Sequence, residues 1–134
     1  MTDFKFSTPI QVRYSDFDML GHINNATFVT YIEVARLYYY IEIGWTLEDV
    51  SNVVAHLDLD FLAPILPGLK VNCRVKTSSI GSKSFQMIYE LYSPEDDVIF
   101  AKGHSVQVCF EKKSGKTVNI PEHIRELINN FEKG

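Results

Sequence analysis

Cysteine is scarce in this chain. Its 134 residues include only Cys73 and Cys109, which lie far apart in segments of alternating polarity. Neither cysteine belongs to a Cys-x-x-Cys pair or has a histidine at ligand spacing, so the sequence predicts two buried free thiols. No two histidines stand at the spacing of metal ligands either, and we therefore expect no metal site.

Basic runs and long apolar runs are also absent. The formal net charge is −4, so an extended phosphate backbone would find no matching positive surface, and we expect no nucleic-acid partner. Residues 1–7 lack the apolar core of a signal peptide, and no apolar stretch is long enough to span a bilayer. These absences predict a cytoplasmic protein without a membrane span.

The chain does contain enough apolar residues for one core. Hydrophobic residues make up 46% of the sequence, and no linker, internal repeat or low-complexity segment divides it. We therefore expect a single domain over residues 1–134.

Strand patterns fill most of the chain after residue 50, and one strand pattern precedes them. Ile10, Val12 and Tyr14 alternate with polar residues, which predicts an early strand. The same two-residue period predicts further strands over the ranges 53–61, 69–76, 84–92 and 98–111. A hairpin turn at 113–116 is expected to lead into another strand over 117–120. Strands linked in this way favour an antiparallel sheet.

The spacing of apolar residues predicts two helices. Apolar side chains cover most of a helical circumference from residue 25 to 43, with Asn24 as the N-cap and Gly44 as the terminator. A helix that is apolar nearly all round should be buried nearly all round. Pro121 opens a second, shorter helical pattern. The result is an α+β chain with the hotdog fold, in which a curved antiparallel sheet wraps around a long central helix.

The densest group of polar side chains stands just before the first predicted helix. Residues 13–25 read RYSDFDMLGHINN and combine two carboxylates, an imidazole, a glycine and two amides. Unpaired N–H groups at a helix start attract negative charge, so this segment is a candidate functional site.

This segment also carries a family resemblance. The pattern Arg13-Tyr14-x-Asp16-x-Asp18-x-x-Gly21-His22-x-Asn24-Asn25, followed by Phe28 and by Glu33-Val34-Ala35-Arg36, resembles the 4-hydroxybenzoyl-CoA thioesterase family of hotdog acyl-CoA thioesterases. The match is specific over residues 11–38 and looser, in strand order and length, over the rest of the chain.

The resemblance implies a role for each polar residue of the segment. It makes Asp18 the catalytic carboxylate, which attacks the thioester carbonyl or deprotonates a water that does. The backbone N–H of Asn25 would stabilise the charge that develops on the carbonyl oxygen. Gly21 would let the backbone pass close to the acyl group. His22 would orient water or the carboxylate, although a histidine satisfied by local hydrogen bonds is an equal alternative.

Three other charged residues of the matched region have structural interpretations. Asp16 is expected to pair with Arg13 or to accept hydrogen bonds from turn N–H groups. Glu33 and Arg36 lie three residues apart on the helix, so they are expected to form an ion pair that holds the motif loop.

The resemblance also implies a substrate and an assembly. Basic residues near the start of a later long strand hold the phosphates of coenzyme A in related enzymes, and Lys83 and Ser84 occupy the comparable place here. The arginine-rich pattern of the 4-hydroxybenzoyl enzyme is replaced by Gly81 and Ser82. The expected partners are an acyl-CoA substrate and further copies of the chain, in a homodimer or homotetramer with sheets joined edge to edge and the acyl pocket at the subunit interface. No cofactor is expected.

The sequence thus predicts an enzyme that hydrolyses an acyl-CoA thioester, or an acyl carrier protein thioester, to free acid and thiol. Two alternatives stay open. A hotdog enoyl-thioester hydratase would use the same residue types, Asp18 and His22, for acid–base chemistry. A non-catalytic module that binds acyl thioesters would keep the fold and the helix start without needing Asp18.

Overall fold

The computed structural model of the protein describes residues 3–134. Its elements, in chain order, are β1 (Phe6–Ile10), the 3₁₀ turn η1 (Tyr14–Asp16), α1 (Asn25–Ile43), β2 (Val50–Phe61), β3 (Val71–Ile80), β4 (Ser84–Tyr92), β5 (Ile99–Glu111) and α2 (Glu122–Lys133).

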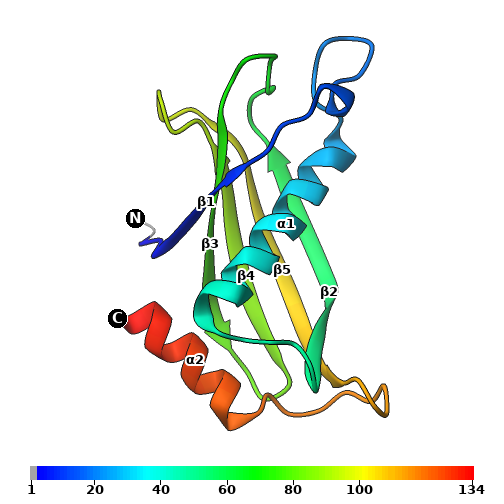
Figure 1. The fold of residues 1–134 in the computed structure, drawn as a ribbon, viewed down its shortest axis with the longest axis vertical. Coiled ribbons are helices and arrows are strands. Elements are labelled where there is room, and N and C mark those ends of the chain that lie inside the picture. The colour runs from blue at the N-terminus through cyan, green and yellow to red at the C-terminus, as the bar shows by residue number, and fades with distance from the viewer. Residues whose placement is uncertain (1–2) are drawn as a thin grey trace.

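The strands form one antiparallel sheet in the order β1-β3-β4-β5-β2, and α1 lies across one face of it (Figure 1). Side chains on that face of β3 and β4 are buried in alternation, as the two-residue period requires. The largest fully buried side chains of the core include Tyr39 of α1 and Phe85 and Tyr89 of β4. This arrangement confirms the predicted hotdog fold.

Helix α1 begins and ends where the sequence predicts. The Asn24 side chain accepts a hydrogen bond from the Ala26 N–H at 2.8 Å, which satisfies one of the free donors at the helix start. At the other end Gly44 adopts φ 90°, in the left-handed region that glycine favours, and its N–H donates to the carbonyls of Tyr40 and Ile41.

Two strand predictions were wrong. The early strand covers 6–10 rather than 10–15, because the chain turns at η1. The Asp16 N–H donates to the Arg13 carbonyl at 3.0 Å and closes the 3₁₀ turn, and the Asp16 side chain caps it by accepting a hydrogen bond from the Arg13 N–H at 2.9 Å. The expected strand over 117–120 is reduced to a single bridge between Phe110 and Thr117. Beyond it the Ile120 N–H donates to the Ser82 carbonyl, so the chain crosses the strand ends instead of running along β5.

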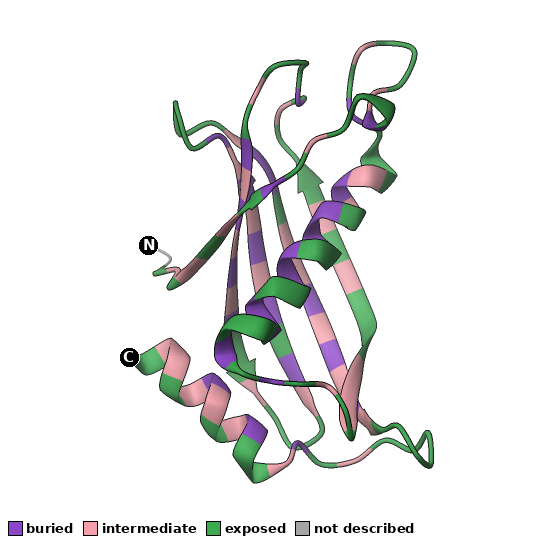
Figure 2. Ribbon diagram, in the orientation of Figure 1, coloured by how far each residue is buried: buried purple, intermediate pink, exposed green. Residues whose placement is uncertain are grey.

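The prediction that α1 is buried nearly all round was also wrong for the single chain. Four large apolar residues on its outer side are 39–61% exposed, and they recur at helical spacing; this apolar stripe consists of Val34, Leu37, Tyr38 and Ile41. One sheet can cover only one side of a helix, and the opposite side of α1 is exposed (Figure 2). Neither α1 nor α2 is both long and apolar enough to cross a membrane.

The two cysteines are free and buried, as predicted. Burial raises the pKa of the Cys109 thiol to about 11. It also raises the pKa of the Cys73 thiol, which has no exposed surface. Both groups are therefore protonated and poorly reactive near neutral pH.

Candidate active site

The motif between η1 and α1 forms a closed loop. Phe17 and Ile23 pair as an antiparallel bridge, and the Asp18 N–H donates to the His22 carbonyl at 2.8 Å. Gly21 adopts φ +81° at the turn of the loop, and a Cβ there would meet no atom within 4 Å. Within this chain, position 21 therefore favours glycine because the backbone is left-handed there, and not because neighbouring atoms pack closely against it.

The Asp18 carboxylate is exposed, and backbone N–H groups of its own loop hold it in place. Its Oδ1 accepts hydrogen bonds from the Leu20 N–H at 2.9 Å and from the His22 N–H at 3.1 Å. Within residues 3–134, Oδ2 has no hydrogen-bond partner. One oxygen is thus fixed in place while the other is available to a water or a substrate.

The Asp16 carboxylate has a different environment, because it is buried. Its Oδ2 accepts a hydrogen bond from the Tyr31 hydroxyl at 2.6 Å, and its Oδ1 accepts one from the Arg13 guanidinium at 3.2 Å. Burial works to raise the pKa of Asp16, but the hydrogen bonds from Tyr31 and Arg13 outweigh it and hold the pKa below its ordinary value. The predicted pairing with Arg13 is present, and the contact with Tyr31 anchors the loop to α1.

The start of α1 borders a small recess. The first helical residue, Asn25, has a backbone N–H without a hydrogen-bond partner in the described chain, as the geometry of a helix start requires. A cavity of about 260 Å³ lies beside it, lined by His22, Ile23, Asn25, Phe28, Phe61, Leu62, Ala63 and Pro64. Phe28 and Phe61 meet edge to face with ring centroids 5.3 Å apart. The recess is apolar on one side and polar at the helix start, and Asp18 is outside its lining.

Lys83 and Ser84 lie far from this recess in the same chain. Ser84 pairs with Val108 at one end of β4, whereas Ala101 pairs with both Leu91 and Phe61 at the other end. The length of β4 from Ser84 to Leu91 is about 24 Å at about 3.4 Å per residue. The structure therefore brings together Asp18, Gly21, His22 and Asn25, but not Lys83 and Ser84.

A second cavity, of about 470 Å³, lies between α1 and the first half of β2. Arg36 lines it, is only 8% exposed, and donates from Nη1 to the Tyr89 hydroxyl at 3.2 Å. The predicted ion pair with Glu33 is present at 3.6 Å, but it lies in this cavity and does not hold the motif loop. No local pattern indicated that the Gln107 side chain reaches the same cavity, where its buried Oε1 has no partner among the described residues.

The family of the chain is shown by its similarity to known proteins. Residues 12–128 match the model of the Thioesterase-like superfamily. The Bacillus subtilis (strain 168) protein YsmA is 33% identical over 129 residues, which is 95% of this chain and 87% of YsmA. The chloroplastic acyl-acyl carrier protein thioesterase ATL2 of Arabidopsis thaliana is 25% identical over 131 residues, or 92% of this chain and 68% of ATL2.

A solved structure is also similar over the whole length. A thioesterase of Thermus thermophilus, complexed with coenzyme A and Zn, has a TM-score of 0.87 and 37% identity, and the match covers 100% of this chain and 99% of that one. The chain therefore belongs to the Thioesterase-like superfamily and is an enzyme that hydrolyses thioesters. The family match is to the superfamily and does not single out the 4-hydroxybenzoyl-CoA thioesterases that the motif resembles.

Proposed function

We propose that the enzyme hydrolyses an acyl-CoA thioester, or an acyl carrier protein thioester, with the carboxylate of Asp18 as the catalytic group. The observation that carries this proposal is that a carboxylate with one fixed oxygen lies on the loop that leads directly into the free N–H group at the start of α1. Asp18 Oδ1 is held by two backbone N–H groups, and the unpaired N–H of Asn25 follows a few residues later beside the recess. A nucleophile or base and an oxyanion donor are the two groups that acyl transfer requires.

Two reaction paths use these groups. As a general base, Asp18 Oδ2 takes a proton from water while the water oxygen bonds to the carbonyl carbon. The resulting oxyanion accepts a hydrogen bond from the Asn25 N–H, and the C–S bond then breaks as the proton passes to the leaving thiolate. As a nucleophile, Asp18 first expels the thiolate to form a mixed anhydride, which water hydrolyses. Both paths need the ionised carboxylate, and neither needs a cofactor.

His22 and Gly21 support the reaction in different ways. The His22 residue lines the recess next to Asn25, where its ring would orient the attacking water. Gly21 allows the left-handed turn that returns the chain from Asp18 to His22. Substitution of Gly21 would therefore act on the position of the carboxylate.

Coenzyme A is the favoured carrier, since the similar T. thermophilus enzyme was crystallised with it, whereas ATL2 acts on acyl carrier protein thioesters. Lys83 and Ser84 lie far from the recess of their own chain, and we expect them to bind the nucleotide of a substrate held in another subunit. A dimer is supported by two exposed features of the single chain. Within residues 3–134, strand β2 pairs on one side only, and the apolar stripe of α1 leaves a large apolar surface uncovered.

The proposal is tested by thiol release from a panel of acyl-CoA and acyl carrier protein substrates, followed with a thiol-reactive dye. The protein's own cysteines are buried, so they contribute little background. We expect Asp18→Asn to lower the rate by at least about 10²-fold, the usual contribution of a general base. Asp96→Asn, which changes an exposed aspartate in the β4–β5 loop, should keep the wild-type rate.

The possible results separate the alternatives. Equal rates for wild type and Asp18→Asn would remove Asp18 from the chemistry. Loss of the conjugated absorbance of an enoyl-CoA without thiol release would indicate a hydratase, and no reaction with any substrate would indicate a binding module. Trapping of an Asp18 anhydride by hydroxylamine would select the nucleophilic path over the general base.

A further inference from the structure

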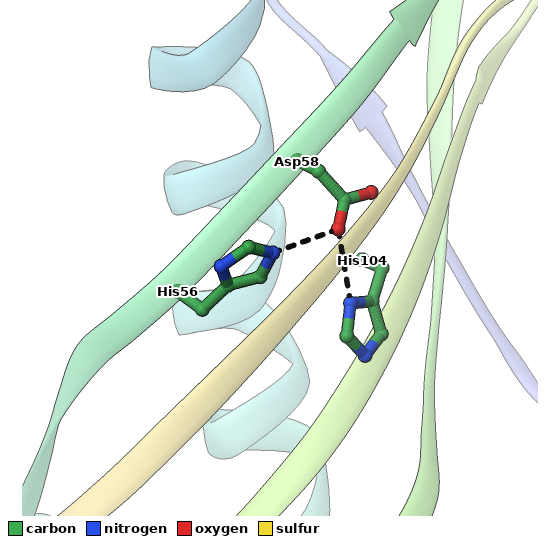
Figure 3. A group of neighbouring side chains, drawn as sticks. All are labelled: His56, Asp58 and His104. Carbon is green, nitrogen blue, oxygen red and sulfur yellow. Dashed lines mark hydrogen bonds and ion pairs between the residues drawn. The ribbon is translucent and has the colours of Figure 1, made fainter.

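Two histidines and an aspartate meet on the face of the sheet that points away from α1. Asp58 of β2 and His104 of β5 are direct partners in the antiparallel register, and His56 precedes Asp58 by two residues on the same strand. In Figure 3 the three side chains converge in front of the strands, with α1 behind them. None of these residues belongs to the candidate active site.

The nitrogen atoms of both histidines point at one carboxylate oxygen. His56 Nε2 lies 3.0 Å from Asp58 Oδ2, and His104 Nδ1 lies 3.2 Å from the same atom. All three potential ligand atoms lie within 4.8 Å of one another. The ligands of a tetrahedral Zn²⁺ ion, bound at about 2.0–2.1 Å, are roughly 3.3 Å apart, so small side-chain rotations would close the group around an ion.

The hydrogen bonds of His104 are compatible with an ion bound between the side chains. Its second ring nitrogen, Nε2, lies 2.9 Å from the Gln86 Oε1 atom. A neutral imidazole has only one N–H, so a His104 that donates to Gln86 presents a lone pair to the carboxylate of Asp58. A cation bound between Nδ1 and Oδ2 removes this repulsion. Gln86 would then fix the tautomer and ring orientation, as the outer partners of metal-bound histidines commonly do.

We propose that His56, Asp58 and His104 bind one Zn²⁺ ion. Two imidazoles and a carboxylate suit zinc better than Mg²⁺ or Ca²⁺, which prefer oxygen ligands. The side chains of His56 and Asp58 are each 58% exposed, so water would complete the coordination. The ion would link the edge strand β2 to β5 and thereby stabilise the edge of the sheet, away from the thioester chemistry on the other face.

Sequence spacing did not indicate this site, because its ligands come from two strands that are distant in the chain. His56 and Asp58 form too short a pattern to be recognised, and His104 joins them only through the pairing of β2 with β5. The sequence-based expectation of no metal site considered spacing alone.

The test is zinc titration of the chelator-stripped full chain against a competing colour indicator. We expect uptake of one equivalent per chain. His56→Ala, His104→Ala and Asp58→Asn should each weaken binding by at least about tenfold, and Gln86→Ala by about tenfold through the ring orientation. His123→Ala is the matched control, since it removes an exposed histidine on α2, and it should bind like wild type.

Two further measurements keep the result interpretable. Circular dichroism checks that each variant is folded, and Asp58→Asn changes the ligand set with little change in shape. The visible spectrum of the Co²⁺-substituted protein should show nitrogen and oxygen ligands without a thiolate charge-transfer band, which excludes the cysteines. The proposal is overturned if wild type takes up no zinc, or if all three ligand variants bind as tightly as His123→Ala.

Discussion

Removal of the Tyr31 hydroxyl tests how the motif loop is attached to α1. In Tyr31→Phe the buried carboxylate of Asp16 loses a hydrogen bond of 2.6 Å from a neutral donor and keeps its contacts with Arg13. A hydrogen bond to a charged group contributes about 1.5–3 kcal/mol, and the phenylalanine ring leaves the packing in place. We expect the free energy of unfolding at pH 7 to fall by about 1.5–3 kcal/mol.

The loss should depend on pH with a definite sign. Hydrogen bonds hold the folded-state pKa of Asp16 below its unfolded value, so the stabilisation is fully present above the unfolded pKa of about 3.9. It is lost as the pH falls through the folded-state pKa. The difference between wild type and Tyr31→Phe should therefore be constant at about pH 5–7 and become smaller below about pH 4.

Urea denaturation at a series of pH values measures this difference. Tyr14→Phe is the matched control, because Tyr14 is 96% exposed. Loss of its hydroxyl should change the free energy of unfolding by less than about 0.5 kcal/mol. Two results would refute the reasoning. One is a change at pH 7 no larger than that of the control, and the other is a difference that stays the same down to pH 3.

Asn24→Ala should lower the free energy of unfolding by about 1 kcal/mol through loss of the N-cap, and urea denaturation that shows no change would contradict it. Gly21→Ala forces a side chain into φ +81°, so we expect about 1–2 kcal/mol of loop strain and a lower rate of thiol release, whereas an unchanged rate would show that the loop tolerates it. Leu37→Glu in the apolar stripe should shift the protein toward monomer in sedimentation, and a wild-type sedimentation profile would place the interface elsewhere. Removal of zinc by a chelator should lower the thermal midpoint by several degrees but leave the rate of thiol release unchanged, and a parallel loss of activity would connect the metal to the chemistry.

The parts of the fold that sequence predicts well are those with strong local causes. Helix α1 has its cap at Asn24 and its terminator at Gly44, and the alternation in β4 gives its bounds without error. The early strand was misplaced because Tyr14 continues an alternating pattern that the Asp16 side chain interrupts. That interruption depends partly on Tyr31, a residue on the next helix.

In the candidate site too, some features have local causes and others depend on residues distant in the chain. Asp18, Gly21, His22 and Asn25 could be grouped from the sequence, because residues only a few positions apart stay close in any fold. Three other relations appear only in the folded chain: Asp16 is buried against Tyr31, Lys83 lies about a strand length from the recess, and His104 meets His56 and Asp58. Those relations depend on strand register and helix placement, which are fixed by packing between segments distant in the chain and leave no local pattern in the sequence.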